Sequence, residues 1–268
     1  MTGPARYTLL ICTCDSYEDA WGPLFTLFRR YWPSLDAPIV LNTETKTYEF
    51  PGYDIYCPQL YKGHPNPAKV PWSRRLRETL TQTVATDLVM IFLDDFYLRS
   101  PVNAERLDIC LRLIEDNPKV ANVALFPCPP PFTPTAEHPW LVKRDKSAPY
   151  LFNLQAGLWR RQRLLHFLRD HESPWYFERW GSIRGRRYPD DFYAIDAGTE
   201  SESILDYDPT KHGLTRGKWR PETGDLFVRE GIEVDLGERD MMSSNPAGYR
   251  RRRNWPATAW NIFRSLRP

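Results

Sequence analysis

The feature that most constrains the fold is an unbroken apolar run, Leu88–Leu93, that ends on two adjacent carboxylates, Asp94 and Asp95. A short apolar run bounded by polar residues is typical of a strand buried on both faces, as in a parallel sheet covered by helices. In such sheets the ligand crevice lies at the carboxyl ends of the strands. Adjacent carboxylates repel each other, and a divalent cation with oxygen ligands relieves that repulsion. The alternative is that one acid caps the next turn and the other is solvated.

The segments around this run alternate between strand and helix patterns, which favours an α/β fold. Strands are predicted over 7–13, 39–43, 54–57, 120–125, 150–159 and 192–195. Helices are predicted after Asp15–Ser16, from Ser73, after the cap Asn103, after Arg160–Arg161, and from Pro174 to a stop at Gly181. The Pro-rich stretch 127–149 shows little sign of regular structure and is expected to be a lid or an acceptor-binding wall. The first strand is followed neither by a Gly-x-Gly-x-x-Gly run nor by a phosphate-loop motif, which disfavours a dinucleotide site.

The charge distribution separates the body of the chain from its end. Net charge is +2, but residues 250–268 hold six Arg and no acid, so the body is mildly acidic. This distribution argues against a nucleic-acid binder, whose basic residues would spread over a docking face. The basic tail, which also carries Trp and Phe, is expected to lie on an anionic membrane surface. The alternative is an arm packed on the body or disordered.

Cysteine usage and hydropathy indicate the compartment. The five Cys have no framework or zinc-site spacing and are read as free thiols in a reducing environment. The N-terminus lacks an apolar signal segment, and no apolar run approaches the length of a membrane span. We expect a cytoplasmic protein, peripheral at the inner face of the membrane if the tail binds there.

Two basic segments are candidates for binding phosphate. Arg74 lies in the first turn of the helix that begins near Ser73, where free N–H groups and a guanidinium converge on an anion. The stretch 208–219 carries His212, Arg216 and Lys218 spaced by two Gly, and a loop with Gly hinges can fold over a diphosphate and stabilise a leaving group. His212 is also a candidate metal ligand. The alternative for each segment is a solvated surface.

Two glutamates are candidates for the general base. Glu172 precedes the helix that Ser173 caps, and the helix dipole would keep it ionised, as a general base requires. Glu178 lies one turn into the same helix. The alternative for each is a structural ion pair with Arg179, Arg184 or Arg186.

Four motifs, taken in order, resemble bacterial glycosyltransferases of the A fold, of the kind found in capsule, O-antigen or exopolysaccharide biosynthesis. They are Trp72-Ser-x-Arg-Leu-Arg-x-x-Leu80, Leu93-Asp-Asp-Phe96, Asn153-Leu-Gln-Ala-Gly-Leu-Trp159 and Glu172-Ser-Pro-Trp-x-Phe-Glu178. The resemblance implies one catalytic domain over residues 1–245, with a mostly parallel central sheet flanked by helices. Its nucleotide-binding part would cover about 1–100 and its acceptor part about 101–245, followed by the basic aromatic tail 246–268.

The resemblance also implies a site. The family's Asp-x-Asp motif binds a metal and the donor ribose, but here Phe96 occupies the third position, so Asp95 holds the ion, Mn²⁺ or Mg²⁺, or the site works without one. Asp94 would then lie beside the donor. The nucleotide of a nucleoside-diphosphate sugar would lie near Thr13, Asp15 and Arg74, with Lys218 on the diphosphate.

The implied reaction is an inverting sugar transfer in cell-surface polysaccharide biosynthesis. Glu172, or failing that Glu178, would deprotonate a hydroxyl of a glycan or lipid-linked acceptor lying along Gln155 to Trp159. Two other functions are considered, a sugar-phosphate nucleotidyltransferase and a non-catalytic carbohydrate- or membrane-binding protein. The first normally carries a Gly-rich basic loop after its first strand, which Cys14-Asp15-Ser16-Tyr17 is not.

Overall fold

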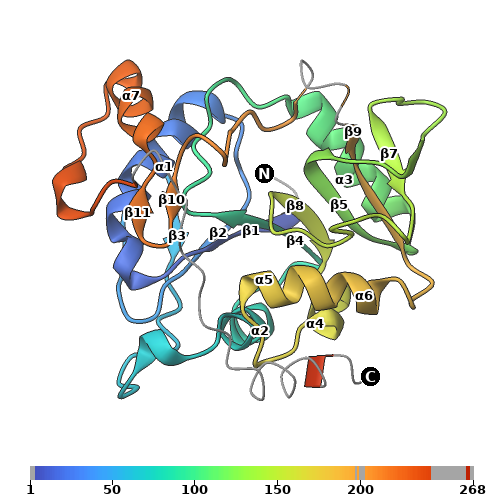
Figure 1. Cartoon of the computed structure of the whole chain (residues 1–268), viewed down its shortest axis with the longest axis horizontal. Helices are drawn as coiled ribbons and strands as arrows, with labels where there is room; N and C mark the ends of the chain where they lie inside the picture. The colour runs from blue at the N-terminus through green and yellow to red at the C-terminus, as the bar shows by residue number, and fades with distance from the viewer. Residues whose placement is uncertain (1–3, 197, 199–202, 243–263, 266–268) are drawn as a thin grey trace.

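The computed structural model describes residues 4–196, 198, 203–242 and 264–265 (Figure 1). The strands are β1 (Tyr7–Cys12), β2 (Ile39–Asn42), β3 (Ile55–Tyr56), β4 (Leu88–Leu93), β5 (Val120–Cys128), β6 (Phe132–Pro134), β7 (Leu141–Arg144), β8 (Gly157–Arg160), β9 (Asp191–Asp196), β10 (Leu214–Thr215) and β11 (Lys218–Trp219). The α-helices are α1 (Glu18–Tyr31), α2 (Trp72–Gln82), α3 (Ala104–Asp116), α4 (Arg161–Phe167), α5 (Pro174–Tyr176), α6 (Ser182–Gly185) and α7 (Pro221–Glu230). Shorter helical turns are η1 (Asp15–Tyr17), η2 (Pro67–Lys69), the π-helix η3 (Phe177–Gly181) and η5 (Leu236–Glu238).

A large sheet with the order β3-β2-β1-β4-β8-β5-β9-β7-β6 forms the centre of the part of the chain that the structure describes. Only β8 and β7 run against the others, because both of the neighbours of each pair with it in antiparallel fashion. The predicted fold class is confirmed: an α/β fold with a mostly parallel central sheet flanked by helices. The chain leaves β1 through α1 to β2 on one side, whereas β4 pairs on the other side of β1. The carboxyl ends of β1 and β4 therefore flank a topological switch point, where open α/β sheets bind their ligands.

The apolar run of β4 is continuous because helices cover both faces of the strand. Met90 and Phe92 belong to the cluster that contains α1 and α3, and Val89 and Ile91 belong to the cluster that contains α2 and α4. All four side chains are at most 1% exposed. Successive side chains of a strand point to opposite faces, so a strand between two helical layers needs apolar residues at every position.

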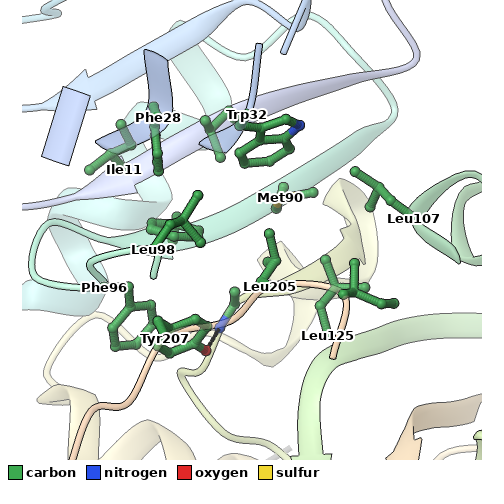
Figure 2. Close-up of a cluster of buried hydrophobic side chains, with 14 of the residues drawn as sticks. Ile11, Phe28, Trp32, Met90, Phe96, Leu98, Leu107, Leu125, Leu205 and Tyr207 are labelled. Atoms are coloured by element: carbon green, nitrogen blue, oxygen red, sulfur yellow. Dashed lines mark hydrogen bonds between the residues drawn. The ribbon is translucent and has the colours of Figure 1, made fainter. Parts of the chain in front are cut away.

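The first of these clusters continues to the end of β4 through Phe96. Figure 2 shows the Phe96 and Tyr207 rings side by side, and their centroids are 4.3 Å apart in a stacked arrangement. The Tyr207 hydroxyl accepts from the Ala156 backbone N–H and donates to Gln155 Oε1, both at 3.0 Å. Phe96 thus serves as a packing residue that joins β4 to the segment before β8.

Several segments differ from the sequence-based expectation. The strand predicted over 150–159 is confined to its end, because β8 begins at Gly157. The stretch 127–149 is not irregular, because it contains the end of β5 and the strands β6 and β7, which extend the sheet. The helix from Pro174 does not stop at Gly181 but continues through η3 and α6 to Gly185. A Cβ at Gly181 would lie 2.8 Å from the Phe152 ring, so this glycine serves close packing rather than helix termination. Helix α7 was not predicted.

The predicted tail 246–268 lies outside the described residues except for Arg264 and Ser265, and so does the boundary proposed at residue 245. All five cysteines are free thiols, as expected. None of the helices in the described ranges has the length and apolar character that a bilayer-spanning helix needs.

Candidate functional site

The acid pair lies where β4 ends, beside the end of β1. Asp94 is 4% exposed, and its Oδ2 accepts a hydrogen bond from the Thr13 hydroxyl. The same hydroxyl accepts from Trp21 Nε1 at 2.7 Å, which fixes its direction. Burial, with the neighbouring charge of Asp95, raises the pKa of Asp94 well above its usual value. Thr13 was predicted near the nucleotide, and here it orients the first acid.

Asp95 faces a hairpin from the far end of the chain. Its Oδ2 accepts the backbone N–H of Leu214 at 2.8 Å. Burial raises the pKa of Asp95 to about 6, against the effect of this hydrogen bond. Gly213 makes the close approach possible, because a Cβ there would lie 2.8 Å from Asp95 Oδ2 and 2.7 Å from its carbonyl oxygen. The φ of Gly213 is +92°, which also favours glycine.

The loops after β1 and β2 are tied together by two carboxylates. Asp15 accepts the backbone N–H groups of Glu44 at 2.8 Å and Thr45 at 2.9 Å, and the Thr45 hydroxyl at 2.6 Å. Although burial acts to raise the pKa of Asp15, these bonds lower it. Glu44 in turn accepts the backbone N–H of Asp15. Asp15 thus shapes the predicted nucleotide loop from within, and its oxygens are already occupied by protein donors.

Arg75, not Arg74, reaches this edge of the sheet. The Arg75 guanidinium forms an ion pair with Glu44, and its Nη1 donates to the Thr13 carbonyl at 3.5 Å. Arg74 instead points outward and pairs with Glu78 on the same helix at 2.8 Å. The cap assignment also differs, because α2 begins at Trp72, after Pro71.

A cavity of about 490 Å³ lies at the loop after β1, lined by Asp15, Ser16, Glu18, Asp19, Lys46 and Arg239, and neither Asp94 nor Asp95 lines it. Its two cations are already paired, Lys46 with Glu18 and Arg239 with Asp19 at 2.5 Å. Arg239 also lies over the Tyr17 ring, 4.8 Å from its centroid. Its charge opposes the rise in the pKa of Asp94, so the guanidinium acts on the acid pair.

The predicted flexible loop 208–219 is instead a hairpin. Strands β10 and β11 pair through Leu214 and Trp219, and the two turn residues, Arg216 and Gly217, have φ of 55° and 76°. Positive φ at both central positions is typical of a tight hairpin turn. Lys218 is half-exposed and pairs with Asp240 at 2.7 Å. The hairpin contacts Asp95 of the acid pair through Leu214. Lys218 lies on this hairpin, but its ammonium pairs with Asp240 and not with the acid pair.

His212 is buried, and its Nδ1 has no hydrogen-bond partner among the described residues. Burial lowers its pKa, and the largest charge effects on it come from Arg99 and Asp208. In the described part of the chain, no group of three or more His, Cys, Asp or Glu side chains is placed to hold a metal. Asp95 and His212 therefore do not make a metal site on their own. A cation at the acid pair would need ligands from outside these side chains, such as phosphate oxygens.

Glu172 does not lie open to a crevice. Its side chain is fully buried and forms a two-pronged ion pair with Arg184, with both N–O distances 2.7 Å. The structural ion pair considered as the alternative is what the structure contains. A carboxylate without solvent access and with both oxygens on a guanidinium has neither the room nor the free lone pairs to accept a substrate proton.

Glu178 is better placed for proton transfer. Its Oε1 accepts the Leu154 backbone N–H at 2.8 Å, and no ion pair with a described residue involves it. Burial raises its pKa. Leu154 lies just before β8, whose Gly157 pairs with Ile91 of β4, so this carboxylate is held near the same edge of the sheet as the acid pair.

The acceptor surface predicted along Gln155 to Trp159 is not available over its whole length. Gly157–Trp159 form the interior of β8 between β4 and β5 and are buried. Only the residues before β8 lie at the edge. An exposed aromatic side chain occurs instead at Trp175, which is 70% exposed and three residues before Glu178.

Sequence patterns did not reveal four residues that shape this edge: Glu44, Arg75, Tyr97 and Arg239. Helix periodicity does not distinguish Arg75 from Arg74, and Glu44 and Arg239 have no local signal. Tyr97 is 1% exposed, and its hydroxyl has no partner within the described residues. Burial raises its pKa, with further contributions from Asp95 and Asp94, so the hydroxyl lies near the acid pair.

No protein-family model matches the sequence, and no curated protein matches it. Solved structures with loosely similar folds include two enzymes. The CMP:2-keto-3-deoxy-manno-octonic acid synthetase complexed with CTP is 12% identical with a TM-score of 0.46, covering 84% of this chain and 97% of its own. The bifunctional glycosyltransferase WbbM, in its apo form, is 10% identical with a TM-score of 0.41, covering 94% of this chain and 47% of its own. This chain thus spans about half of the WbbM chain, and likenesses at this level transfer no function.

Proposed function

We propose that this protein transfers a sugar from a nucleoside-diphosphate sugar to a glycan or glycolipid acceptor in cell-surface polysaccharide biosynthesis. The observation that carries the proposal is the position of Asp94 and Asp95 at the topological switch point between β1 and β4. Two adjacent buried carboxylates with raised pKa values are costly for stability, which is typical of a functional site. The order of the four sequence motifs supports the same reaction class.

The donor would bind across the ends of β1, β2 and β4. The loops that Asp15 and Glu44 tie together form a rigid wall for the nucleoside, with the Arg75 guanidinium behind it. The diphosphate would lie toward Asp95 and the β10–β11 hairpin, where Lys218 and Arg239 would exchange their present acids for phosphate oxygens. Rigid loops of this kind favour catalysis because the reacting groups are oriented before the substrate arrives.

The acceptor would lie on the other side of the acid pair, near Glu178. An acceptor hydroxyl would attack the anomeric carbon, the bond from that carbon to the diphosphate would break, and Glu178 would take the hydroxyl proton. The raised pKa of Glu178 suits this role, because a general base works best with a pKa near the operating pH. The exposed indole of Trp175 offers a flat apolar face beside it for a sugar ring.

Thermal unfolding with a panel of nucleotides, with and without Mn²⁺, tests this proposal. A transferase is expected to be stabilised by one nucleoside diphosphate and its sugar conjugates, since ligands that bind only the native state raise the unfolding temperature. Stabilisation by a nucleoside triphosphate and a sugar phosphate instead would indicate the nucleotidyltransferase. A protein that responds to oligosaccharides or anionic vesicles but to no nucleotide would be the binding protein.

A further inference from the structure

Ser265 lies in a charged socket formed by residues far from it in the sequence. Ser265 is fully buried, and its carbonyl oxygen accepts from Arg184 Nη1 at 2.6 Å. Its hydroxyl lies 3.0 Å from His171 Nε2. We call Arg184, Glu172 and His171 the C-terminal socket. Residues 264–265 are therefore held by specific polar contacts, far in sequence from the elements that receive them.

Ser265 supplies one of the acceptors that the Arg184 guanidinium uses, and Arg184 Nε has no hydrogen-bond partner among the described residues. Arg184 donates to both oxygens of Glu172 and to the Phe167 carbonyl, each at 2.7 Å, and to Ser265. The side chains of Arg184 and Glu172 are 6% and 0% exposed. A buried ion pair is tolerated only when its remaining donors and acceptors are satisfied. Removing Ser265 would withdraw one of these partners and open the pair to water.

Glu172 also holds the start of α2. Its backbone carbonyl accepts the N–H of Ser73 at 3.2 Å. Two residues further along α2, Arg75 reaches Glu44 and the Thr13 carbonyl at the nucleotide edge. A second tie runs in parallel, because Arg77 of the same helix pairs with Asp170 at 2.5 Å and donates to the Leu168 carbonyl.

We propose that Glu172 and Arg184 are positioning residues for the nucleotide edge, and that the docked C-terminal residues set their position. The docked Ser265 holds Arg184 and Glu172 in place, Glu172 holds the first turn of α2, and α2 holds Arg75 against the loops after β1 and β2. The proposal rests on the proposed function only in taking a nucleotide as the ligand of that edge. The glutamate that sequence reasoning chose as the general base thus acts through a helix rather than on the substrate.

The first experiment needs no ligand. Hydrogen exchange measured by mass spectrometry would compare the full chain with a variant that lacks residues 264–268. Exchange in the first turn of α2 is expected to become about tenfold faster in the truncated chain, since coupling between sites commonly spans 5- to 150-fold. Arg184→Ala should accelerate exchange in the same turn at least as much, because it also removes the partner of Glu172. Arg112→Ala, which removes an exposed ion pair on α3, serves as the control and should leave α2 unchanged.

The double variant decides whether the residues act together. If Ser265 acts through the socket, truncation combined with Arg184→Ala should accelerate exchange no more than Arg184→Ala alone. Additive effects, or unchanged exchange in α2 on truncation, would overturn the proposal. If truncation prevents folding, Ser265→Trp takes its place, because an indole cannot fit the fully buried position of Ser265 and should displace its carbonyl from Arg184. The first turn of α2 should then exchange severalfold faster, and no change would overturn the proposal.

Nucleotide affinity supplies the functional readout. The ligand is the nucleoside diphosphate that most stabilises the full chain. Truncation should weaken its binding about tenfold, and a peptide with the sequence of residues 257–268 should restore the affinity. In transfer assays the loss should appear in KM for the donor rather than in kcat. Altered exchange without any nucleotide binding would contradict the proposed function alone. Altered exchange with unchanged nucleotide affinity would overturn the positioning role.

Discussion

The Leu214 backbone N–H donates to Asp95 Oδ2 at 2.8 Å, which joins a hairpin late in the chain to the end of β4. Residues 119 positions apart thus meet at the carboxyl edge of the sheet. This contact orients the Asp95 carboxylate, which is buried beside Asp94. Such a pair is a cost to the folded protein that a charged ligand would offset.

Replacing Asp95 should therefore stabilise the protein without ligand. The pKa of Asp95 is raised to about 6 in the folded state, so the folded chain binds more protons than the unfolded chain between about pH 4 and 6, and stability falls as the pH rises through that range. Asp95→Asn keeps an acceptor for Leu214 and removes the charge. We expect the free energy of unfolding to rise by about 1–3 kcal/mol at pH 8 and by almost nothing below pH 4.

Urea unfolding from pH 3.5 to 8, in buffer with a chelator, measures this difference. Asp54→Asn changes an exposed acid and should not alter the pH profile. A stability difference between the wild type and Asp95→Asn that is the same at every pH would contradict the buried-charge explanation.

The two glutamates of the fourth motif should fail in different ways. Glu178→Gln removes the proposed base and should reduce transfer at least about a hundredfold while leaving donor affinity and stability nearly unchanged. Glu172→Gln leaves the Arg184 charge buried without its partner and should cost about 3–5 kcal/mol of stability. Turnover by Glu178→Gln near the wild-type rate would place the base elsewhere.

Neighbouring arginines on α2 provide a matched pair of variants. Arg75→Ala should raise the donor KM about tenfold or more, because Glu44 loses its partner and the nucleotide loops loosen. Arg74→Ala removes only an exposed ion pair within one helix and should change KM less than twofold. Equal effects of the two substitutions would show that Arg75 has no special role at this edge.

Cation binding should depend on the nucleotide. The described residues place two carboxylates at the end of β4 and no third candidate ligand in a group with them. Mn²⁺ alone is therefore expected to bind only weakly, and a nucleoside diphosphate should increase its affinity at least about tenfold by adding phosphate oxygens. Titration calorimetry with Mn²⁺, before and after adding the diphosphate, measures this. Tight binding of Mn²⁺ without the diphosphate would contradict this prediction, because it would require further protein ligands beside the two carboxylates.

The central strands could be predicted because local chemistry specifies them. Because β4 is buried on both faces, its apolar run predicted both of its ends correctly. Asn103 and Ser173 also cap their helices as expected, and each side chain accepts a backbone N–H of its own helix. Strands β6 and β7 were missed because their stability comes from pairing with the edge of a sheet that distant residues build.

The site was harder to predict because its partners come from separate parts of the chain. The sequence indicates that Glu172 precedes one helix and that Glu178 lies within it. Only the fold shows that Arg184 pairs with Glu172 and that Glu178 has no ion pair among the described residues. Likewise, periodicity could not distinguish Arg74 from Arg75, since the distinction depends on where Glu44 lies after β2.

The most direct measurement of the central claim is a crystal structure of the complex with the nucleoside diphosphate that most stabilises the protein. We expect the phosphates to lie beside Asp95 and the β10–β11 hairpin, and the nucleoside to lie against the loops that hold Asp15 and Glu44. A nucleotide bound elsewhere, with Asp94 and Asp95 still covered only by protein, would contradict it.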